Sequence, residues 1–309
     1  MTVAFFMHED CLNHITPEGH PEQVARLRRI AEALGSPDFD ALDRRAAPLG
    51  EDADIALCHP QSYIDRIASA VPDEGRARLD EDTWLSAGSM TAARRAVGGA
   101  IAAVDAVLDG SAQKAFVAAR PPGHHAETAT PMGFCLFGNI AIAARHALER
   151  RGLSRVAVVD FDVHHGNGTQ DLLWNEARAL FIGSHQSPLW PGTGRASETG
   201  AHGNVMNIEL APDSGGTEMR AAYEAEVFPA LEDFKPELLL VSAGFDAHAR
   251  DPLAQLNWQT DDYVWLTERL CDVAARHCGG KLVSLLEGGY DLDALAQASA
   301  AHVGALLSA

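Results

Sequence analysis

The 309-residue sequence contains few cysteines, few basic residues and no long apolar run. Its five cysteines form no C-x-x-C pair, which favours buried free thiols in a reducing cytoplasm over disulfides. No apolar stretch approaches the length of a membrane-spanning helix, and the beginning of the chain shows no secretory signal. We therefore expect a cytoplasmic protein with no membrane partner.

Basic residues are scarce compared with acidic ones, at 24 Lys and Arg against 43 Asp and Glu, so the formal net charge is -19. This balance disfavours nucleic acid as a partner, because phosphate binding needs clustered basic side chains. It would attract cationic substrates such as polyamines or basic peptides, although many proteins are acidic for solubility alone. No G-x-G-x-x-G follows the first strand-like segment, which argues against an NAD-dependent enzyme.

Short apolar runs alternate with helical patterns along the chain. The runs are Val3–Met7, Ala115–Ala119, Val156–Phe161, Leu180–Gly183, Leu238–Ser242 and Leu282–Leu286. The helical patterns are Pro21–Leu34, Ser86–Leu108, Asn139–Arg150, Asp261–His277 and Leu292–Leu307. This alternation predicts an α/β fold with three layers, in which helices cover both faces of a central, mostly parallel sheet. With no linker, we expect one domain over residues 1–309, and a long loop at 186–204.

The segment DFDVHHGNGT, from Asp160 to Thr169, places two carboxylates and two imidazoles at the end of a buried run. Because alternate side chains of a strand share a face, Asp160, Asp162 and His164 start on one side. Carboxylate and imidazole ligands without a thiolate are typical of a catalytic Zn²⁺ or Fe²⁺ that keeps an open position. The rival interpretation is a capped loop of hydrogen-bonded polar residues.

Three other apolar runs also end in polar groups next to glycine, at Gly123–His125, Ala243–Asp246 and Glu287–Tyr290. Ligands gather at the carboxyl ends of parallel strands, so these loops should meet on one side of the sheet. Each residue also has a simpler interpretation: Tyr290 as a packed turn residue, Asp246 as a helix N-cap, and the tandem histidines as hydrogen-bonded turn residues. The convergence of all four loops favours a site.

The residue types in these loops suggest a division of roles. Asp162, His164 and Asp246 supply three metal ligands and leave a fourth position open. His124 and His125 can transfer protons near neutral pH, and the phenol of Tyr290 can donate to a developing oxyanion. With no Ser or Cys nucleophile, this set points to metal-assisted hydrolysis of an amide by water.

Five ordered motifs resemble the histone deacetylase family, which has the arginase–deacetylase fold. They are RPPGHHAE (120–127), GFCLFGN (133–139), DFDVHHGNGTQ (160–170), SAGFDAH (242–248) and LEGGY (286–290), and weaker similarity begins at the HPE of residues 20–22. The resemblance implies that Asp162, His164 and Asp246 bind zinc and that metal-bound water attacks the acyl group. It also implies that His124 and His125 are the catalytic histidines and that Tyr290 polarises the carbonyl.

The resemblance also implies supporting residues. Asp160 orients His124 and, with Asp162 and His164, contributes to a structural K⁺ site. The family often has Ser where Gly183 stands here, so Ser184 is the expected substitute in that site.

Asn167 follows the class II pattern, whereas class I members have Asp behind the second histidine. A neutral amide stabilises an imidazolium less than a carboxylate does, so the pKa of His125 should be raised less than that of His124. This favours His125 as the base and His124 as the more cationic partner. Which histidine protonates the leaving amine stays open.

The implied substrate is an acyl-lysine peptide or another acylated amine. Phe134 is expected to form one wall of the channel for the methylene stem, and Trp190 either forms the opposite wall or is an exposed loop residue. Polyamine-specific relatives have Glu at the position of Leu253, so Leu253 favours acyl-lysine, with acetylpolyamine amidohydrolase as the alternative. A homo-oligomer is compatible with the sequence but not specified by it.

Two other classes remain to be distinguished. An arginase-like ureohydrolase would share the fold but needs two Mn ions and more aspartates, and the tandem histidines with Tyr290 argue against it. A non-catalytic acyl-lysine binding module is the alternative from a different class, although every expected catalytic residue is present.

Overall fold

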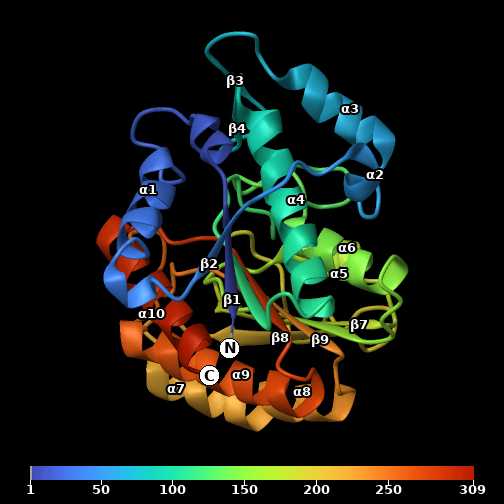
Figure 1. Ribbon diagram of the computed structural model, residues 1–309, viewed down its shortest axis with the longest axis vertical. Coiled ribbons are helices and arrows are strands. Elements are labelled where there is room, and N and C mark those ends of the chain that lie inside the picture. The colour runs from blue at the N-terminus through green and yellow to red at the C-terminus, as the bar shows by residue number, and fades with distance from the viewer. Residues whose placement is uncertain (1) are drawn as a thin grey trace.

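A computed structural model describes residues 2–309 (Figure 1). Its central sheet has eight strands in the order β2-β1-β5-β10-β9-β6-β7-β8, and all the strand pairs in it are parallel. The strands are β1 (Val3–Met7), β2 (Asp43–Ala46), β5 (Lys114–Val117), β6 (Val156–Asp160), β7 (Ala179–Gln186), β8 (Val205–Leu210), β9 (Leu238–Ala243) and β10 (Leu282–Leu286). A separate antiparallel hairpin joins β3 (Arg76–Arg78) to β4 (Trp84–Ser86).

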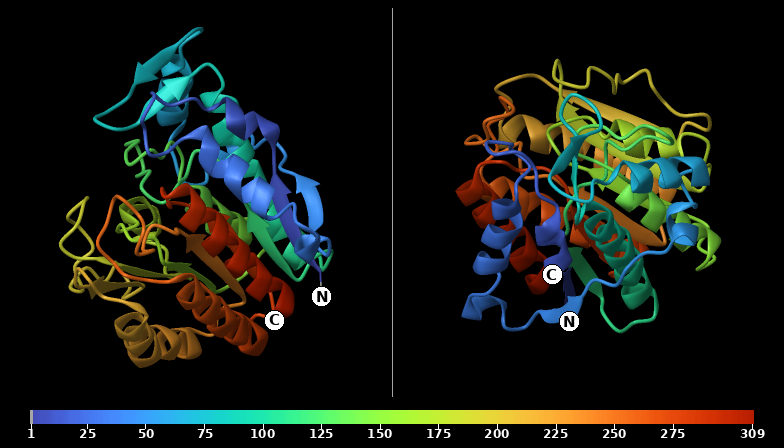
Figure 2. Two further views of the ribbon diagram at one scale, coloured as in Figure 1. Left: turned by 90° about the vertical axis from the view of Figure 1, so that its left-hand side faces the viewer. Right: turned by 90° about the horizontal axis from the view of Figure 1, so that it is seen from above.

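Helices cover both faces of the sheet (Figure 2). On one side α4 (Ser89–Leu108) packs on β5 and on α5 (Asn139–Glu149), which contacts β6 and α6 (Asn167–Leu173). On the other side α9 (Thr260–His277) contacts β9, and α10 (Leu292–Ser308) lies between α9 and α1 (Val24–Ala33). The remaining segments are α2 (Asp52–Ile55), α3 (Gln61–Ala70), α7 (Gly216–Ala222), α8 (Phe228–Phe234), η1 (Glu9–Asn13), η2 (Pro37–Phe39) and η3 (Tyr223–Val227). The three-layer arrangement with a parallel sheet is confirmed.

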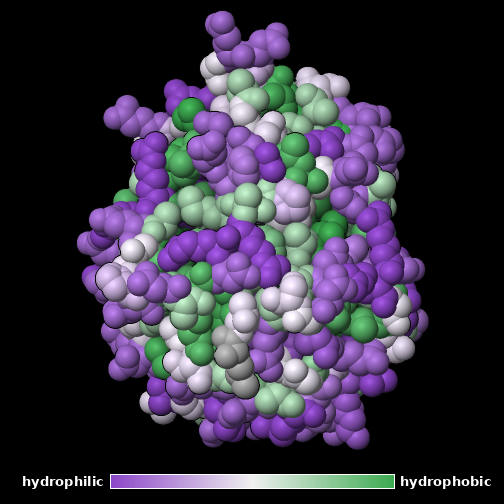
Figure 3. Space-filling view, viewed as in Figure 1, coloured by the Kyte–Doolittle hydropathy of each residue, from purple (hydrophilic) through white to green (hydrophobic). Residues whose placement is uncertain are grey.

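The central strands are apolar because both of their faces are covered. Every residue of β5, β6, β9 and β10 is buried. Strands of this kind appear as continuous apolar runs, which made them visible in the sequence. Hydrophilic side chains cover most of the face seen in Figure 3, with smaller apolar patches between them. Within residues 2–309, no helix is both long and apolar enough to cross a bilayer.

The main differences from the sequence prediction lie at β7 and β8. Strand β7 continues past Gly183 to Gln186. Its last residues are polar yet buried, so no apolar run marks this end of the strand in the sequence. The long loop therefore begins after Gln186 and ends at β8, a strand that the sequence prediction did not include. In β8, at the edge of the sheet, Met206 and Glu209 are more exposed than the other residues of the strand.

Candidate active site

The four strands that end in polar loops are neighbours in the sheet, in the order β5-β10-β9-β6. All four are parallel, so their carboxyl ends lie at one edge and their loops meet there. The convergence inferred from the sequence therefore has a simple structural cause. It brings together side chains that are as far apart in sequence as His124 and Tyr290.

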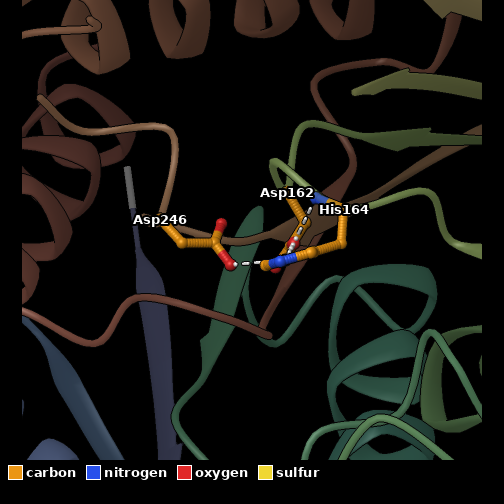
Figure 4. Close-up of side chains that lie close together, drawn as sticks. All are labelled: Asp162, His164 and Asp246. Atoms are coloured by element: carbon orange, nitrogen blue, oxygen red, sulfur yellow. Dashed lines mark hydrogen bonds and ion pairs between the residues drawn. The ribbon is translucent and has the colours of Figure 1, made fainter. Parts of the chain in front are cut away.

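Asp162, His164 and Asp246 point toward one another from the loops after β6 and β9 (Figure 4). One potential ligand atom from each lies within 4.8 Å of the other two. The Nδ1 atom of His164 lies 3.3 Å from Oδ1 of Asp162 and 3.2 Å from Oδ2 of Asp246. Two carboxylates and an imidazole are thus gathered around one point.

The charges in this cluster call for a cation. Burial and the charge of Asp162 raise the pKa of Asp246. Burial alone would lower the pKa of His164, but hydrogen bonds with both carboxylates raise it to about 10. Two buried carboxylates are costly next to each other unless positive charge lies between them. A divalent metal with carboxylate and imidazole ligands fits this requirement.

Two glycines allow the backbone to approach the cluster closely. A Cβ atom on Gly244 would overlap the carboxylate of Asp162, and one on Gly288 would overlap those of both Asp246 and Asp162. The N–H of Gly288 donates to Oδ2 of Asp162 at 2.8 Å. Any larger residue at these positions would displace the carboxylates.

His124 lies behind this cluster and is held by Asp160. Its Nδ1 lies 3.0 Å from Oδ2 of Asp160, and its Nε2 lies 3.7 Å from Oδ2 of Asp162. Burial alone would lower the pKa of His124, but the charges of Asp162 and Asp160 outweigh it and raise the pKa well above the usual value. His124 therefore favours the cationic form.

His125 is paired with an amide instead. The Nδ2 group of Asn167 donates to Oε1 of Glu127 at 2.9 Å, which directs Oδ1 toward Nδ1 of His125, 2.8 Å away. An amide oxygen only accepts, so the His125 Nδ1 carries the proton and its Nε2 keeps a free lone pair. Burial, with the neighbouring His124 and His164, lowers the pKa of His125 well below the usual value. The pKa of His124 is therefore higher than that of His125, as expected from the carboxylate partner of His124 and the amide partner of His125.

A pocket of about 230 Å³ opens beside the cluster. Its lining residues are Asp82, His125, Gly133, Phe134, His164, Leu189, Trp190, Leu253 and Tyr290. Four of them provide apolar walls, His125 and Tyr290 belong to the candidate catalytic set, and His164 is a candidate metal ligand. The pocket therefore combines an apolar slot with proton-transfer groups, as an amphipathic substrate requires.

Phe134 and Trp190, the two aromatic residues expected to form the channel, both line this pocket. The ring of Trp190 stands edge-on to His125, with 4.7 Å between ring centroids, although 43% of the residue remains exposed. Phe134 has φ of 68°. This left-handed conformation raises the free energy of any residue other than glycine. The ring of Phe134 packs edge-on against Tyr290.

Tyr290 lines the same pocket as His164 and keeps its proton. Burial, followed by the charge of Asp246, raises the pKa of its phenol well above the usual value. The guanidinium of Arg26 lies over its ring, 4.9 Å from the centroid. The phenol is thus a hydrogen-bond donor at every physiological pH.

Comparison with known proteins decides the family. The family model for the histone deacetylase domain matches residues 20–306. The chain belongs to the histone deacetylase family. It is 40% identical over 309 residues to a histone deacetylase-like amidohydrolase of Pseudomonas aeruginosa, covering 93% of this chain and 81% of the relative. It is also 40% identical over 306 residues to the chloroplastic histone deacetylase 10 of rice (Oryza sativa subsp. japonica), covering 92% of this chain and 68% of the relative.

The crystal structure of the HDA15 HD domain superposes with a TM-score of 0.94 at 32% identity, covering 99% of this chain and 88% of that one. The arginase–deacetylase fold expected from the motifs is therefore confirmed. Like its family, the protein is a hydrolase that acts on amides.

Ser184, expected at the cation site, and His165, within the DFDVHHGNGTQ motif, bond to residues outside the group of Asp162, His164 and Asp246. The hydroxyl of Ser184 lies 2.8 Å from that of Tyr223. His165, which follows the candidate ligand His164, bonds to Thr193 at 2.8 Å and to Gln170 at 3.0 Å, so its ring fixes the loop instead of facing the pocket.

Three residues at the deacetylase site were not given roles from the sequence. Glu287 is fully buried, and its Oε2 accepts the N–H groups of Gly123 and His124 at 2.7 and 3.1 Å. Asp82 lines the pocket from the distant β3–β4 hairpin, and nothing in the sequence indicates this. Arg26 donates to the carbonyls of Glu287 and Gly289. Only Glu287 had a sequence signal, because it lies in the LEGGY motif.

A fully buried ion cluster links the N-terminal HPE motif of the deacetylase to its catalytic loops. The carboxylate of Glu22 pairs with Arg26 at 3.1 Å and with both Nε and Nη2 of Arg120. None of the three side chains is exposed. Arg120 precedes the loop with the tandem histidines and Arg26 contacts Tyr290, so Glu22 joins the two sides of the site.

Proposed function

We propose that this deacetylase is a zinc-dependent amidohydrolase that removes acetyl or other acyl groups from the side-chain amine of acyl-lysine-like substrates. The observation that carries the proposal is the position of Asp162, His164 and Asp246 beside an apolar-walled pocket that His125 and Tyr290 also line. We propose residues 1–309 as one deacetylase domain, since strands from both ends of the chain share one sheet.

Asp162, His164 and Asp246 would hold the metal, because their donor set and excess negative charge suit Zn²⁺, with Fe²⁺ as the alternative. When bound, the metal would polarise the acyl carbonyl and lower the pKa of a water molecule. The same buried region would hold a structural K⁺ ion near Asp160, Asp162, His164 and Ser184. Its support is that Asp160 pairs in register with Gly183, next to Ser184.

The remaining steps fall to side chains of the chain itself. The free Nε2 of His125 would take the proton from the attacking water, since its Nδ1 proton is bound to Asn167. His124, kept cationic by Asp160, would stabilise developing negative charge. The Tyr290 phenol would donate to the carbonyl oxygen as it becomes an oxyanion.

The pocket walls support a substrate with a long apolar stem. Phe134, Leu189, Trp190 and Leu253 would exclude water from the methylene groups of an acyl-lysine side chain. Leu253 offers no charge for a second ammonium of a polyamine. Asp82 lines the same pocket, and its Oδ1 accepts the hydroxyl of Thr83 at 3.0 Å. The remaining acceptor positions of its carboxylate would serve an N–H donor of the substrate.

The test compares an acetyl-lysine peptide with an acetylated polyamine, together with metal analysis of the purified protein. We expect one catalytic metal per chain and a higher kcat/KM for the peptide. The variant Leu253→Glu should shift the preference toward the polyamine. Faster cleavage of the polyamine by the unchanged protein would overturn the substrate assignment, and binding of the peptide without cleavage would identify a non-catalytic acyl-lysine binding module.

The role of Tyr290 needs a separate measurement. Tyr290→Phe should lower kcat by about two orders of magnitude or more, as for loss of an oxyanion donor, while metal content stays unchanged. Unaltered turnover would refute the assignment.

A further inference from the structure

A buried carboxylate outside the candidate catalytic set joins two walls of the pocket. Asp251 lies in the loop after β9 and is 8% exposed. Its Oδ2 accepts the N–H groups of Tyr290 at 2.7 Å and Asp291 at 3.3 Å, and its Oδ1 accepts the N–H of Leu253 at 3.0 Å. One side chain therefore fixes the backbone of two pocket residues, Tyr290 and Leu253, that come from different strand-end loops.

The backbone around Tyr290 needs such an anchor. Tyr290 follows Gly288 and Gly289, and Gly289 has φ of 116°, a conformation open only to glycine without strain. Arg26 holds the segment before Tyr290 through the carbonyls of Glu287 and Gly289. Asp251 holds the segment after the glycine pair through two N–H groups. Together they remove the freedom that the glycines would otherwise give the phenol.

Burial, followed by the charge of Asp246, raises the pKa of Asp251 to about 7, so the fold holds this carboxyl where its ionised form is disfavoured. Across residues 2–309, no Lys, Arg or His nitrogen lies within ion-pair distance of its carboxylate, so only backbone N–H groups compensate its burial. Burying a carboxylate without a cation is costly. A residue kept at such a cost next to a catalytic side chain points to geometry required by the reaction.

We propose that Asp251 is a positioning residue for amide hydrolysis. It fixes the backbone of Tyr290 relative to that of Leu253, so that the Tyr290 phenol reaches the acyl carbonyl of the substrate. This inference rests on the proposed function, in which Tyr290 donates to that oxygen. Asp251 is neither a lining residue of the pocket nor one of the candidate metal ligands, and it acts through the backbone of Tyr290. Its loss should therefore matter only while the phenol is present.

A double-mutant cycle tests this dependence. In the unchanged background, Asp251→Ala should lower kcat on an acetyl-lysine peptide by about 10- to 100-fold, since a small displacement of a catalytic group has effects of this size. Asp251→Asn should lower it less, because the amide oxygen can still accept two N–H groups. In the Tyr290→Phe background, Asp251→Ala should lower kcat further by no more than about twofold.

Asp262→Asn provides the matched control. Asp262 is a similarly buried carboxylate that accepts the N–H of Gln259 at 2.8 Å, but it caps α9 and does not line the pocket. It should change kcat by less than about twofold in both backgrounds. Metal content and thermal unfolding, measured for every variant, identify any loss of the fold, and Asp251→Asn carries the same cycle if Asp251→Ala does not fold.

Two outcomes would overturn the proposal. One is a loss of kcat from Asp251→Ala that is equally large with and without the Tyr290 hydroxyl, which would show a general structural role. The other is full turnover by Asp251→Ala. These results differ from failure of the proposed function, which would appear as full turnover by Tyr290→Phe alone.

Discussion

Glu22 should control the stability of the whole active-site edge, and replacing it with glutamine measures this directly. Burial alone would raise the pKa of Glu22, but the charge and hydrogen bonds of Arg120, with the charge of Arg26, lower it from 4.5 to about 2. Lowering the pKa from 4.5 to about 2 corresponds to about 3 kcal/mol of folding free energy. Glu22→Gln should cost at least this much, because it leaves two guanidiniums buried with no carboxylate between them.

The pH dependence of this effect has a definite sign. The pKa of Glu22 is lower in the folded than in the unfolded chain, so the ionised carboxylate stabilises the fold above pH 4.5. That contribution is lost as the pH falls from 4.5 toward 2. The difference in unfolding free energy between the unchanged protein and Glu22→Gln should therefore be largest near pH 7 and shrink below pH 4.5.

Urea unfolding followed by circular dichroism at a series of pH values measures both quantities. Glu32→Gln on the same helix is the control, because Glu32 is exposed and its ion pair with Arg29 should contribute less than about 1 kcal/mol. The reasoning is refuted if Glu22→Gln unfolds within about 1 kcal/mol of the unchanged protein at pH 7. It is also refuted if the difference stays constant down to pH 3.

Three further predictions concern the site. Asn167→Asp should raise the pKa of His125 and shift the acid limb of the kcat/KM profile upward by about one unit or more; an unmoved limb would exclude His125 as the base. Trp190→Ala should raise KM for an acetyl-lysine peptide about tenfold through lost apolar contact, whereas Leu49→Ala, at a comparably exposed leucine, should not. Chelation should abolish turnover and lower Tm, both restored by Zn²⁺, because the metal binds only the folded chain; an equal Tm with and without metal would argue against the site.

The strands that build the site were predictable because their burial is uniform. Val156–Asp160 and Leu282–Leu286 are apolar runs that end in polar loops, and parallel pairing then dictates that the loops meet. Strand β8 was missed because its polar and apolar residues mix at a sheet edge. The last residues of β7 were missed because they are polar although buried.

At residue level, side chains next to a strand end were predictable and those brought in from elsewhere were not. Asp162 and Asp246 closely follow strands, so their position in the sequence indicates that they lie together. Asp82 reaches the pocket from a distant hairpin, which no sequence pattern indicates. Asp251 accepts backbone N–H groups of residues up to 40 positions away, and its proposed role depends on these contacts. For Trp190, both alternatives hold in part, since it lines the pocket and remains partly exposed.

The glycines beside Asp162 and Asp246 limit how this protein can diverge. Gly244 and Gly288 carry no chemistry, yet any side chain there would overlap the carboxylates of Asp162 or Asp246. A survey of random substitutions should therefore find these two positions as intolerant as the proposed metal ligands. New substrate preferences would arise instead through wall residues such as Leu253, so a change of substrate leaves the hydrolytic centre intact.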